Sequence, residues 1–301
     1  MGSEVIKCTF QALGSRCEIV LDTAHEDLAE ECFLLAKSEV ERIEKKYSRF
    51  REDSVVSIIN AAAGKTSIFC DDETCELIRF GQSLYEVSGG LFDMTAGLLS
   101  RAWDFRSAKI PTTAEIDYFR GLVGWSKVKW DGRHISLPLV GMHIDFGGFG
   151  KEYAVDRVST LLRARGITSG YVNFGGDIAV MGPRSDQSPW LLGIQDPRKS
   201  GQVVATIPVF IGALASSGDY ERFFEIEGKR YCHVIHPETG HPVSYWRSVT
   251  VLASQVVIAG GYTTIAMLME RDGLDFLQAS GLEFLAIDQQ GSVYRNEAKA
   301  K

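Results

Sequence analysis

The chain has 301 residues, 45% hydrophobic and 24% charged, which is typical of a globular protein with a substantial buried core. Its formal net charge is -7 and it has no long Lys/Arg run, so we expect no nucleic-acid partner. No apolar stretch reaches the ~18 residues that a membrane-spanning helix needs, so we expect no membrane span. The start lacks a basic and apolar leader, which predicts a cytoplasmic protein, or a periplasmic one if a signal peptide has been removed.

The first half of the chain is predicted to contain one hairpin and three helices. Stretches rich in β-formers at 5–10 and 16–21 flank Ala12-Leu13-Gly14-Ser15, a pattern typical of a β-hairpin. The helical spacing of apolar residues predicts helices over 26–46 and 72–87. The capping residues Thr112 and Thr113 indicate a third helix over 113–122.

The second half is predicted to consist mainly of strands. Strands at 128–130 and 134–137 flank the turn pair Asp131-Gly132, and a strand over 142–145 leads into a helix that begins near Lys151. Further strands are expected over 171–174, 178–181, 190–194, 203–207, 210–214, 222–226, 231–235 and 248–252, with an apolar helix over about 258–270. This order favours an α+β fold with mixed sheets and flanking helices. We expect a single unit over residues 1–301, with two interleaved lobes as the alternative arrangement.

Three glycines lie between the strand over 142–145 and the next helix, in Asp145-Phe146-Gly147-Gly148-Phe149-Gly150-Lys151. Glycine lets the backbone approach a ligand closely, and a helix N-terminus offers N–H groups to an anion such as a pyrophosphate. The pattern is neither a Walker A loop nor a dinucleotide fingerprint. Taken alone, it is also typical of an ordinary tight turn between a strand and a helix.

Three other stretches have residue types that suit a ligand. Gly175-Gly176-Asp177 could place a carboxylate beside it, and the small residues over 215–220 suit backbone contact to a base or a phosphate. Gly260-Gly261 followed by Thr263-Thr264, at the expected start of the last helix, suits an anion or a cation. Each stretch also has an ordinary interpretation as a turn, a loop or a softened helix start.

Three of the six histidines lie within residues 233–241. His233, near the end of an expected strand, could donate a proton, polarise a phosphate or bind a metal. A zinc site made of His233, His236 and His241 is an alternative, although neighbours on a tight turn rarely converge on one ion.

In their order and spacing, these stretches resemble the motifs of the ApbE-like flavin transferases, and the resemblance covers about residues 10–269. The matching stretches are Leu13-Gly14-Ser15, Tyr47-Ser48-Arg49-Phe50 with Asp53-Ser54 and Asn60, Gly90 to Thr95, Asp145 to Asp156, Gly175 to Ile178, Ser216 to Tyr220 and Arg230 to Ile235. The resemblance implies a T-fold-related, flavin-binding unit.

Proteins of that family bind FAD, use Mg²⁺ and move FMN from FAD to a Ser or Thr hydroxyl of a target protein, releasing AMP. The resemblance therefore implies FAD as ligand, a flavin-acceptor protein as partner, and His233 and Lys151 as catalytic residues. The flavin-binding positions that it implies are Leu13, Phe50, Leu91, Phe92, Asp93, Asp145, Gly147, Lys151, Asp177, Ser217, Gly218 and Ile235. The metal-binding positions that it implies are Gly148, Thr263 and Thr264.

The sequence departs from the family pattern at three positions: Gly260 and His236 each stand where the family has Asp, and Glu152 stands where it has Gly. A carboxylate is the hard, anionic ligand that Mg²⁺ prefers. One hypothesis is therefore an active transferase in which Glu152 or His236 replaces the lost ligand. The alternative is a flavin carrier, chaperone or sensor without transfer activity; an enzyme that hydrolyses FAD needs the same charge neutralisation. We also expect Gly260→Asp to tighten Mg²⁺ binding.

Overall fold

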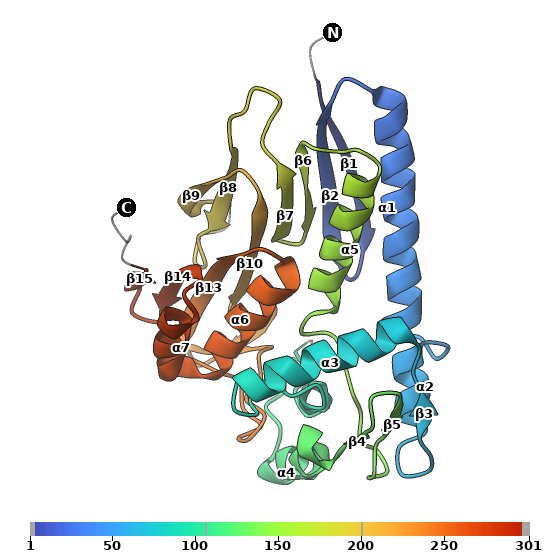
Figure 1. Cartoon of the computed structure of the whole chain (residues 1–301). Helices are drawn as coiled ribbons and strands as arrows, with labels where there is room; N and C mark the ends of the chain where they lie inside the picture. Colours follow the sequence, from blue (N-terminus) through green and yellow to red (C-terminus); the bar gives the residue numbers. More distant parts are fainter. Residues whose placement is uncertain (1–3, 106, 200, 297–301) are drawn as a thin grey trace.

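The computed structural model describes residues 4–105, 107–199 and 201–296 (Figure 1). Its largest sheet within these ranges has eight strands, and every neighbouring pair is antiparallel. Across the sheet the strands are β1 (Glu4–Ala12), β2 (Ser15–Thr23), β6 (Gly170–Phe174), β7 (Asp177–Gly182), β10 (Gly212–Gly218), β13 (Trp246–Ala253), β14 (Glu283–Asp288) and β15 (Val293–Arg295). The expected α+β class is confirmed.

Helices cover one face of this sheet and a hairpin covers the other (Figure 1). The long α1 (Glu26–Tyr47), α5 (Gly150–Ala164) and α6 (Val256–Leu268) pack on the first face. The hairpin of β8 (Trp190–Gln195) and β9 (Val203–Val209) packs on the second. Successive side chains of a strand point to opposite faces of the sheet. Ile19 therefore packs in the core under the helices, whereas its neighbour Val20 packs in the cluster under the hairpin.

The chain between α1 and α5 forms most of a second region, at the lower end of Figure 1. It contains α2 (Val55–Ala61), α3 (Asp72–Val87), a 3-10 helix (Ala96–Arg101), α4 (Thr113–Leu122), a short 3-10 turn (Trp125–Lys127) and the small sheet β3 (Ile68–Phe69), β5 (His134–Ser136) and β4 (Lys129–Trp130). One hydrophobic cluster runs from this region into the helical layer, because Phe92 and Phe146 both pack against Phe149 at the start of α5. The α3 and α4 bounds match the sequence-based prediction.

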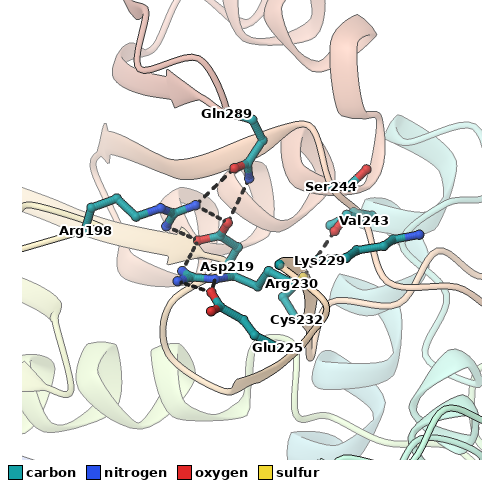
Figure 2. Close-up of a pocket in the computed structure, with 10 residues that line it drawn as sticks. Arg198, Asp219, Glu225, Lys229, Arg230, Cys232, Val243, Ser244 and Gln289 are labelled. Atoms are coloured by element: carbon teal, nitrogen blue, oxygen red, sulfur yellow. Dashed lines mark hydrogen bonds and ion pairs between the residues drawn. The ribbon is translucent and has the colours of Figure 1, made fainter.

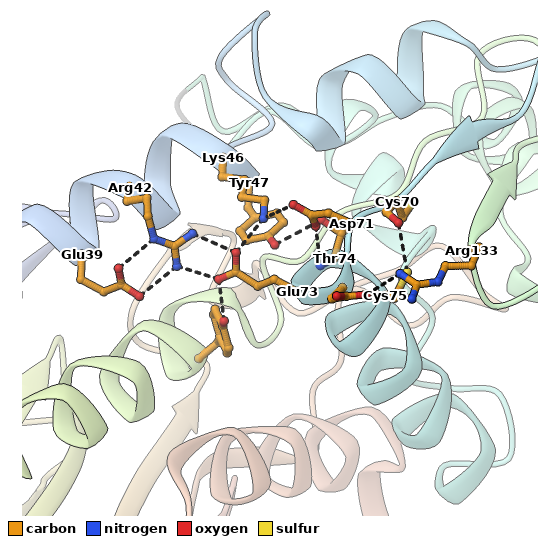
Figure 3. Close-up of polar contacts among 12 residues, drawn as sticks. Glu39, Arg42, Lys46, Tyr47, Cys70, Asp71, Glu73, Thr74, Cys75 and Arg133 are labelled. Atoms are coloured by element: carbon orange, nitrogen blue, oxygen red, sulfur yellow. Dashed lines mark hydrogen bonds and ion pairs between the residues drawn. The ribbon is translucent and has the colours of Figure 1, made fainter. Parts of the chain in front are cut away.

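A charge network also joins the two regions (Figure 3). The Glu73 carboxylate of α3 lies 2.6 Å from Arg42 and 2.6 Å from Lys46 of α1, and it accepts a hydrogen bond of 2.7 Å from the Tyr153 hydroxyl of α5. Arg42 binds Glu39 as well. Burial alone would raise the pKa of Glu73, but these donors hold that pKa well below its usual range. The network therefore fixes α3 against both α1 and α5.

Two sequence-based predictions were wrong. Residues 142–145 form no strand, since the Asn60 side chain takes the place of a neighbouring strand: it accepts from the Ile144 N–H at 2.7 Å and donates to the Ile144 carbonyl at 3.0 Å. The last helix begins at Val256, so Gly260 and Gly261 lie inside it and not at its start. Its first N–H groups, those of Val256 and Val257, bind the Asp156 carboxylate at 2.9 and 3.0 Å.

A separate hairpin and a short helix make up the remaining elements of the C-terminal half. The β-hairpin β11 (Phe223–Ile226) and β12 (Lys229–Cys232) follows β10, and α7 (Gly273–Ser280) packs on α6 after a 3-10 turn (Glu270–Asp272). Residues Ser216–Gly218 are part of strand β10, so they do not form the loop that was the ordinary interpretation of this stretch. No helix within the described ranges is long and apolar enough to cross a membrane.

Candidate active site

The glycine-rich turn before α5 brings the backbone close to its neighbours. The Gly147 N–H donates to Asp145 Oδ1 at 2.8 Å, and a Cβ at Gly148 would lie only 2.8 Å from the Phe92 ring. A larger residue at 148 would therefore push the turn away from Phe92. The N-terminus of α5 follows directly; its Gly150 N–H donates to the Phe146 carbonyl at 2.6 Å, and the helix dipole favours an anion at this place.

Lys151 lies in the first turn of α5, with its ammonium 2.8 Å from Oδ2 of Asp177 at the start of β7. Asp177 is only 2% exposed, whereas the Lys151 side chain keeps some access to solvent. Burial lowers the pKa of Lys151, but the carboxylates of Asp177 and Glu152 raise it above its ordinary value. Lys151 is therefore a cation at neutral pH and is placed to meet an anion at the start of the helix.

Two turns lie beside Lys151. The β6–β7 turn needs Gly175, which has a φ of +63° and whose Cβ would lie 3.0 Å from Ser15 and 3.5 Å from the Lys151 ammonium. Leu13 and Gly14 of the β1–β2 turn both have positive φ, the conformation of the tight hairpin turn that matches strand twist. The fold thus places Leu13 and Asp177 at the same end of the sheet.

His233 follows β12, and its backbone N–H donates to the Arg222 carbonyl at 2.9 Å. Its Nδ1 is buried and has no hydrogen-bond partner within the described residues. Burial lowers the pKa of His233 to about 4, with further lowering by the cations Arg222 and Lys151. The imidazole is therefore neutral at neutral pH, within electrostatic reach of Lys151, and can accept a proton.

Hydroxyl groups gather between β10 and α6. Ser217 Oγ lies 2.8 Å from Thr263 Oγ1 and 3.4 Å from Thr264 Oγ1, and the Thr263 hydroxyl donates to the Gly260 carbonyl at 2.9 Å. Gly218 is next in the strand, where a Cβ would lie 2.2 Å from the Tyr220 ring. The structure thus brings two predicted flavin-binding positions, Ser217 and Gly218, next to the predicted metal positions Thr263 and Thr264; both roles stay predictions.

A buried carboxylate lies beside this hydroxyl cluster. Glu152 of α5 is 9% exposed, and its Oε2 has no hydrogen-bond partner within the described residues. Burial first, and then the Asp177 carboxylate, raise the pKa of Glu152 well above its ordinary value. A buried carboxyl group with an unpaired oxygen is unfavourable unless a proton or a cation reaches it.

On the far side of the glycine-rich turn, a cleft of about 540 Å³ runs along α2 and the 3-10 helix Ala96–Arg101. Phe50 lies on it, 84% exposed, with the Arg49 guanidinium stacked 4.9 Å from its ring. Arg49 also binds Asp145 at 2.6 Å. The structure therefore brings Phe50 and Asp145 to one cleft. Arg101 and His143 line it too, and no sequence motif had pointed to them.

Several residues predicted to bind the flavin use their side chains for hydrogen bonds or packing within the protein. The Asp93 carboxylate accepts from the Thr95 N–H and hydroxyl at 2.7 and 2.6 Å and from the Trp125 N–H at 2.7 Å. Phe92 is buried against Phe149, and Ile235 is buried in a cluster around Trp103. Leu91 packs at the edge of the core. For these four positions, flavin binding stays a prediction.

The histidine-rich segment does not form a metal site. The His236 N–H donates to the His241 carbonyl at 2.8 Å, and His236 Nδ1 accepts from the Glu238 N–H at 3.3 Å, which closes a turn. In the parts of the chain that the structure describes, no group of three or more His, Cys, Asp or Glu side chains could hold a metal ion. The zinc alternative has no support, and any metal site here would need hydroxyl or carbonyl ligands as well.

A second cavity, of about 310 Å³, lies beside the buried Asp219 (Figure 2). Asp219 binds Arg198 through two contacts of 2.6 and 2.7 Å and accepts from Gln289 at 2.8 Å. Arg230 lies 3.3 Å from the same carboxylate and also binds Glu225. Because these charges satisfy one another, the cluster fixes the segment from β10 to β12, and hence the position of His233.

Fold and site together define an α+β protein in which a charged lysine begins a helix after a glycine-rich turn, with a buried histidine within electrostatic reach of that lysine and a group of hydroxyls between β10 and α6. The ApbE family profile matches residues 13–286, and the chain belongs to the ApbE family.

Similar proteins carry names that describe flavin transfer. The FAD:protein FMN transferase of Vibrio cholerae serotype O1 is 29% identical and is aligned over 87% of this chain and 80% of its own length. The FAD:protein FMN transferase of Treponema pallidum is 30% identical and is aligned over 82% of this chain and 75% of its own length. Among solved structures, the ApbE protein of Thermotoga maritima has a TM-score of 0.88 at 30% identity, covering 98% and 97%. The flavinyl transferase ApbE of Pseudomonas stutzeri, in its apo form, has a TM-score of 0.85 at 27% identity, covering 99% and 96%.

Proposed function

We propose that this protein is an FAD:protein FMN transferase, which moves FMN from FAD to a Ser or Thr hydroxyl of a target protein and releases AMP. The observation that carries the proposal is the Lys151 ammonium, which Asp177 holds at the glycine-rich start of α5, with the buried His233 within its electrostatic reach. The similar proteins named FAD:protein FMN transferase support the same reaction.

Lys151, Phe50 and His233 each have a separate role in the proposed reaction. The N-terminus of α5 and Lys151 bind the pyrophosphate of FAD, and Phe50 offers a ring on which a flavin or a base can stack. The acceptor hydroxyl oxygen forms a bond to the phosphorus of the FMN half while the anhydride P–O bond breaks, and AMP leaves with the electron pair. Neutral His233 accepts the hydroxyl proton. Lys151 offsets the negative charge on the phosphate oxygens, which is the main requirement of phosphoryl transfer.

Mg²⁺ suits the oxygen-rich cluster at the other side of Lys151. The ligand positions expected from the family are the Gly148 carbonyl and the hydroxyls of Thr263 and Thr264, all of which are hard oxygen donors. The unpaired Oε2 of buried Glu152 fits a cation in the same neighbourhood. When bound there, Mg²⁺ would neutralise charge on the transferred phosphate.

The alternative of a flavin carrier or sensor rested on the absence of a carboxylate at Gly260. The similar proteins give it no support, because those with functional names are transferases. The carboxyl group of Glu152 lies where a side chain at position 260 would project, which also weighs against this alternative.

Covalent flavin on a denaturing gel tests the proposal. We expect that incubating the protein with FAD, Mg²⁺ and a cell extract produces a fluorescent band that survives denaturation, with FMN mapped by mass spectrometry to a Ser or Thr. His233→Ala should abolish the band while FAD still binds. If FAD binds but no protein becomes flavinylated under any condition, the proposal is wrong.

A further inference from the structure

Gly260 and Glu152 compete for the same space. Gly260 lies in the second turn of α6, where a Cβ would lie 2.7 Å from Glu152 Cγ and 3.0 Å from its Oε1. Contacts of 3.0 Å or less do not occur for a Cβ unless something moves. The Glu152 side chain therefore occupies the volume into which any side chain at position 260 would project.

Glu152 packs against the part of α6 that leads to Thr263 and Thr264. Thr264 lies four residues after Gly260, so the two share a helix face, and the Thr263 hydroxyl binds the Gly260 carbonyl at 2.9 Å. Glu152 Oε1 is beside Gly260 on that face, and Oε2 is buried without a partner. The packing of α5 on α6 thus places Glu152 next to Gly260, in the same helix as Thr263 and Thr264, whose hydroxyls contact Ser217.

Two neighbouring groups compete with a cation for the Glu152 carboxyl. The first is the Lys151 ammonium, which binds Asp177 at 2.8 Å, and the second is Asp177 itself, whose carboxyl lies within hydrogen-bonding reach of Glu152. The alternative is a proton shared between the Glu152 and Asp177 carboxyls, and a cation would have to displace it. His236, the other residue that could replace a lost ligand, is held in the turn that it closes with His241.

We propose that Glu152 supplies from α5 the carboxylate ligand for Mg²⁺ that position 260 of α6 does not provide. The two departures from the family pattern are then one exchange, in which the carboxylate has moved from one helix to the helix packed against it. The proposal rests on the proposed function for the identity of the cation, and on the contacts above for the ligand.

The proposal reverses the expectation for Gly260→Asp. In the presence of Glu152, an Asp at 260 has to displace the Glu152 side chain and adds a like charge beside it, so the single variant should bind metal no more tightly than the natural protein and should be less stable. In Glu152→Gly with Gly260→Asp, the space is free and the carboxylate is restored from α6.

Binding of Mn²⁺, followed by the loss of the free-ion signal in electron paramagnetic resonance, tests this directly, with Mg²⁺ as competitor. We expect Glu152→Gln to weaken Mn²⁺ binding at least tenfold, and the double variant Glu152→Gly, Gly260→Asp to regain most of that loss. Glu41→Gln, on the exposed side of α1, is the matched control and should bind like the natural protein. Thermal unfolding shows that each variant is folded.

Three results would overturn the proposal: no Mn²⁺ binding by the natural protein, unchanged binding by Glu152→Gln, or no recovery in the folded double variant. None of them depends on FMN transfer. If Glu152→Gln lowers metal affinity and the protein flavinylates nothing, the ligand assignment stands and the proposed function fails. If transfer occurs and Glu152→Gln binds Mn²⁺ normally, the function stands and the ligand assignment fails.

Discussion

At the scale of single residues, Lys151 is a cation that Asp177 holds at the start of α5. A charge-assisted contact to a phosphate stabilises a complex by about 1.5–3 kcal/mol, so Lys151→Ala should weaken FAD binding roughly tenfold or more. Riboflavin lacks a phosphate, and its affinity should change little. Titrations followed by flavin fluorescence measure both constants, with Lys45→Ala on α1 as control. An equal loss for both ligands would place Lys151 away from the phosphates.

The buried His233 should make the folded protein less stable as the pH falls. Its pKa is lowered to about 4 in the folded protein, so the unfolded chain takes up the proton first as the pH falls. The stability that neutral His233 contributes is present above about pH 6.5 and is lost as the pH falls towards 4. Between pH 7 and pH 5 this loss is about 2 kcal/mol.

Urea unfolding at pH 7 and pH 5 measures this loss. His233→Gln should lose less stability than the natural protein over the same interval, because the variant has no group that titrates there. If the two proteins lose the same amount, His233 is not held neutral by its surroundings.

At the scale of elements, sequence predicts best where the signal is local. The bounds of α3 and α4 follow from capping side chains, since Asp71 accepts from the Thr74 N–H and Thr112 forms a reciprocal capping box with Glu115. The wrong strand over 142–145 has a non-local cause: the side chain of Asn60, distant in sequence, supplies both of its hydrogen bonds. The same holds for the site, where the motifs indicated Lys151 and His233 but the contact between Glu152 and Gly260 needs the packing of two helices.

The start of α6 depends on a residue from another helix. Gln255, its N-cap residue, makes no side-chain cap, and Asp156 of α5 binds the Val256 and Val257 N–H groups in its place. Asp156→Ala leaves two partly buried N–H donors unsatisfied and should lower the free energy of unfolding by about 2 kcal/mol. It should also weaken Mn²⁺ binding, because α6 carries Thr263 and Thr264. Asp117→Ala, at an exposed position of α4, should change stability by under about 0.5 kcal/mol; a similar loss in both variants would contradict the capping role.

At the scale of the whole molecule, the site depends on how the second region is fixed against the helical layer, because the cleft and the start of α5 come from different sides of that contact. Glu73 joins α1, α3 and α5 through Arg42, Lys46 and Tyr153. Glu73→Gln should lower the free energy of unfolding at pH 7 by about 1–3 kcal/mol.

The pH dependence follows from the lowered pKa of Glu73. The stability that its carboxylate contributes is present above the ordinary glutamate pKa and is lost as the pH falls below it, so the difference between the natural protein and Glu73→Gln should shrink below about pH 4.5. Chemical denaturation across this range measures it. Glu76→Gln, on the exposed side of the same helix, should differ little from the natural protein at any pH. A loss in Glu73→Gln that stays constant down to pH 3 would show that packing, and not charge, is responsible.

In the proposed reaction, FAD is cleaved by transfer of FMN to a protein and not by water. The most direct measurement is the ratio of AMP released to FMN bound covalently on the acceptor, determined in one reaction by chromatography and by the absorbance of the denatured, desalted protein. We expect about one AMP for each FMN bound, with little free FMN, and the loss of both products in His233→Ala. AMP and free FMN in equal amounts, with no flavin on any protein, would contradict it.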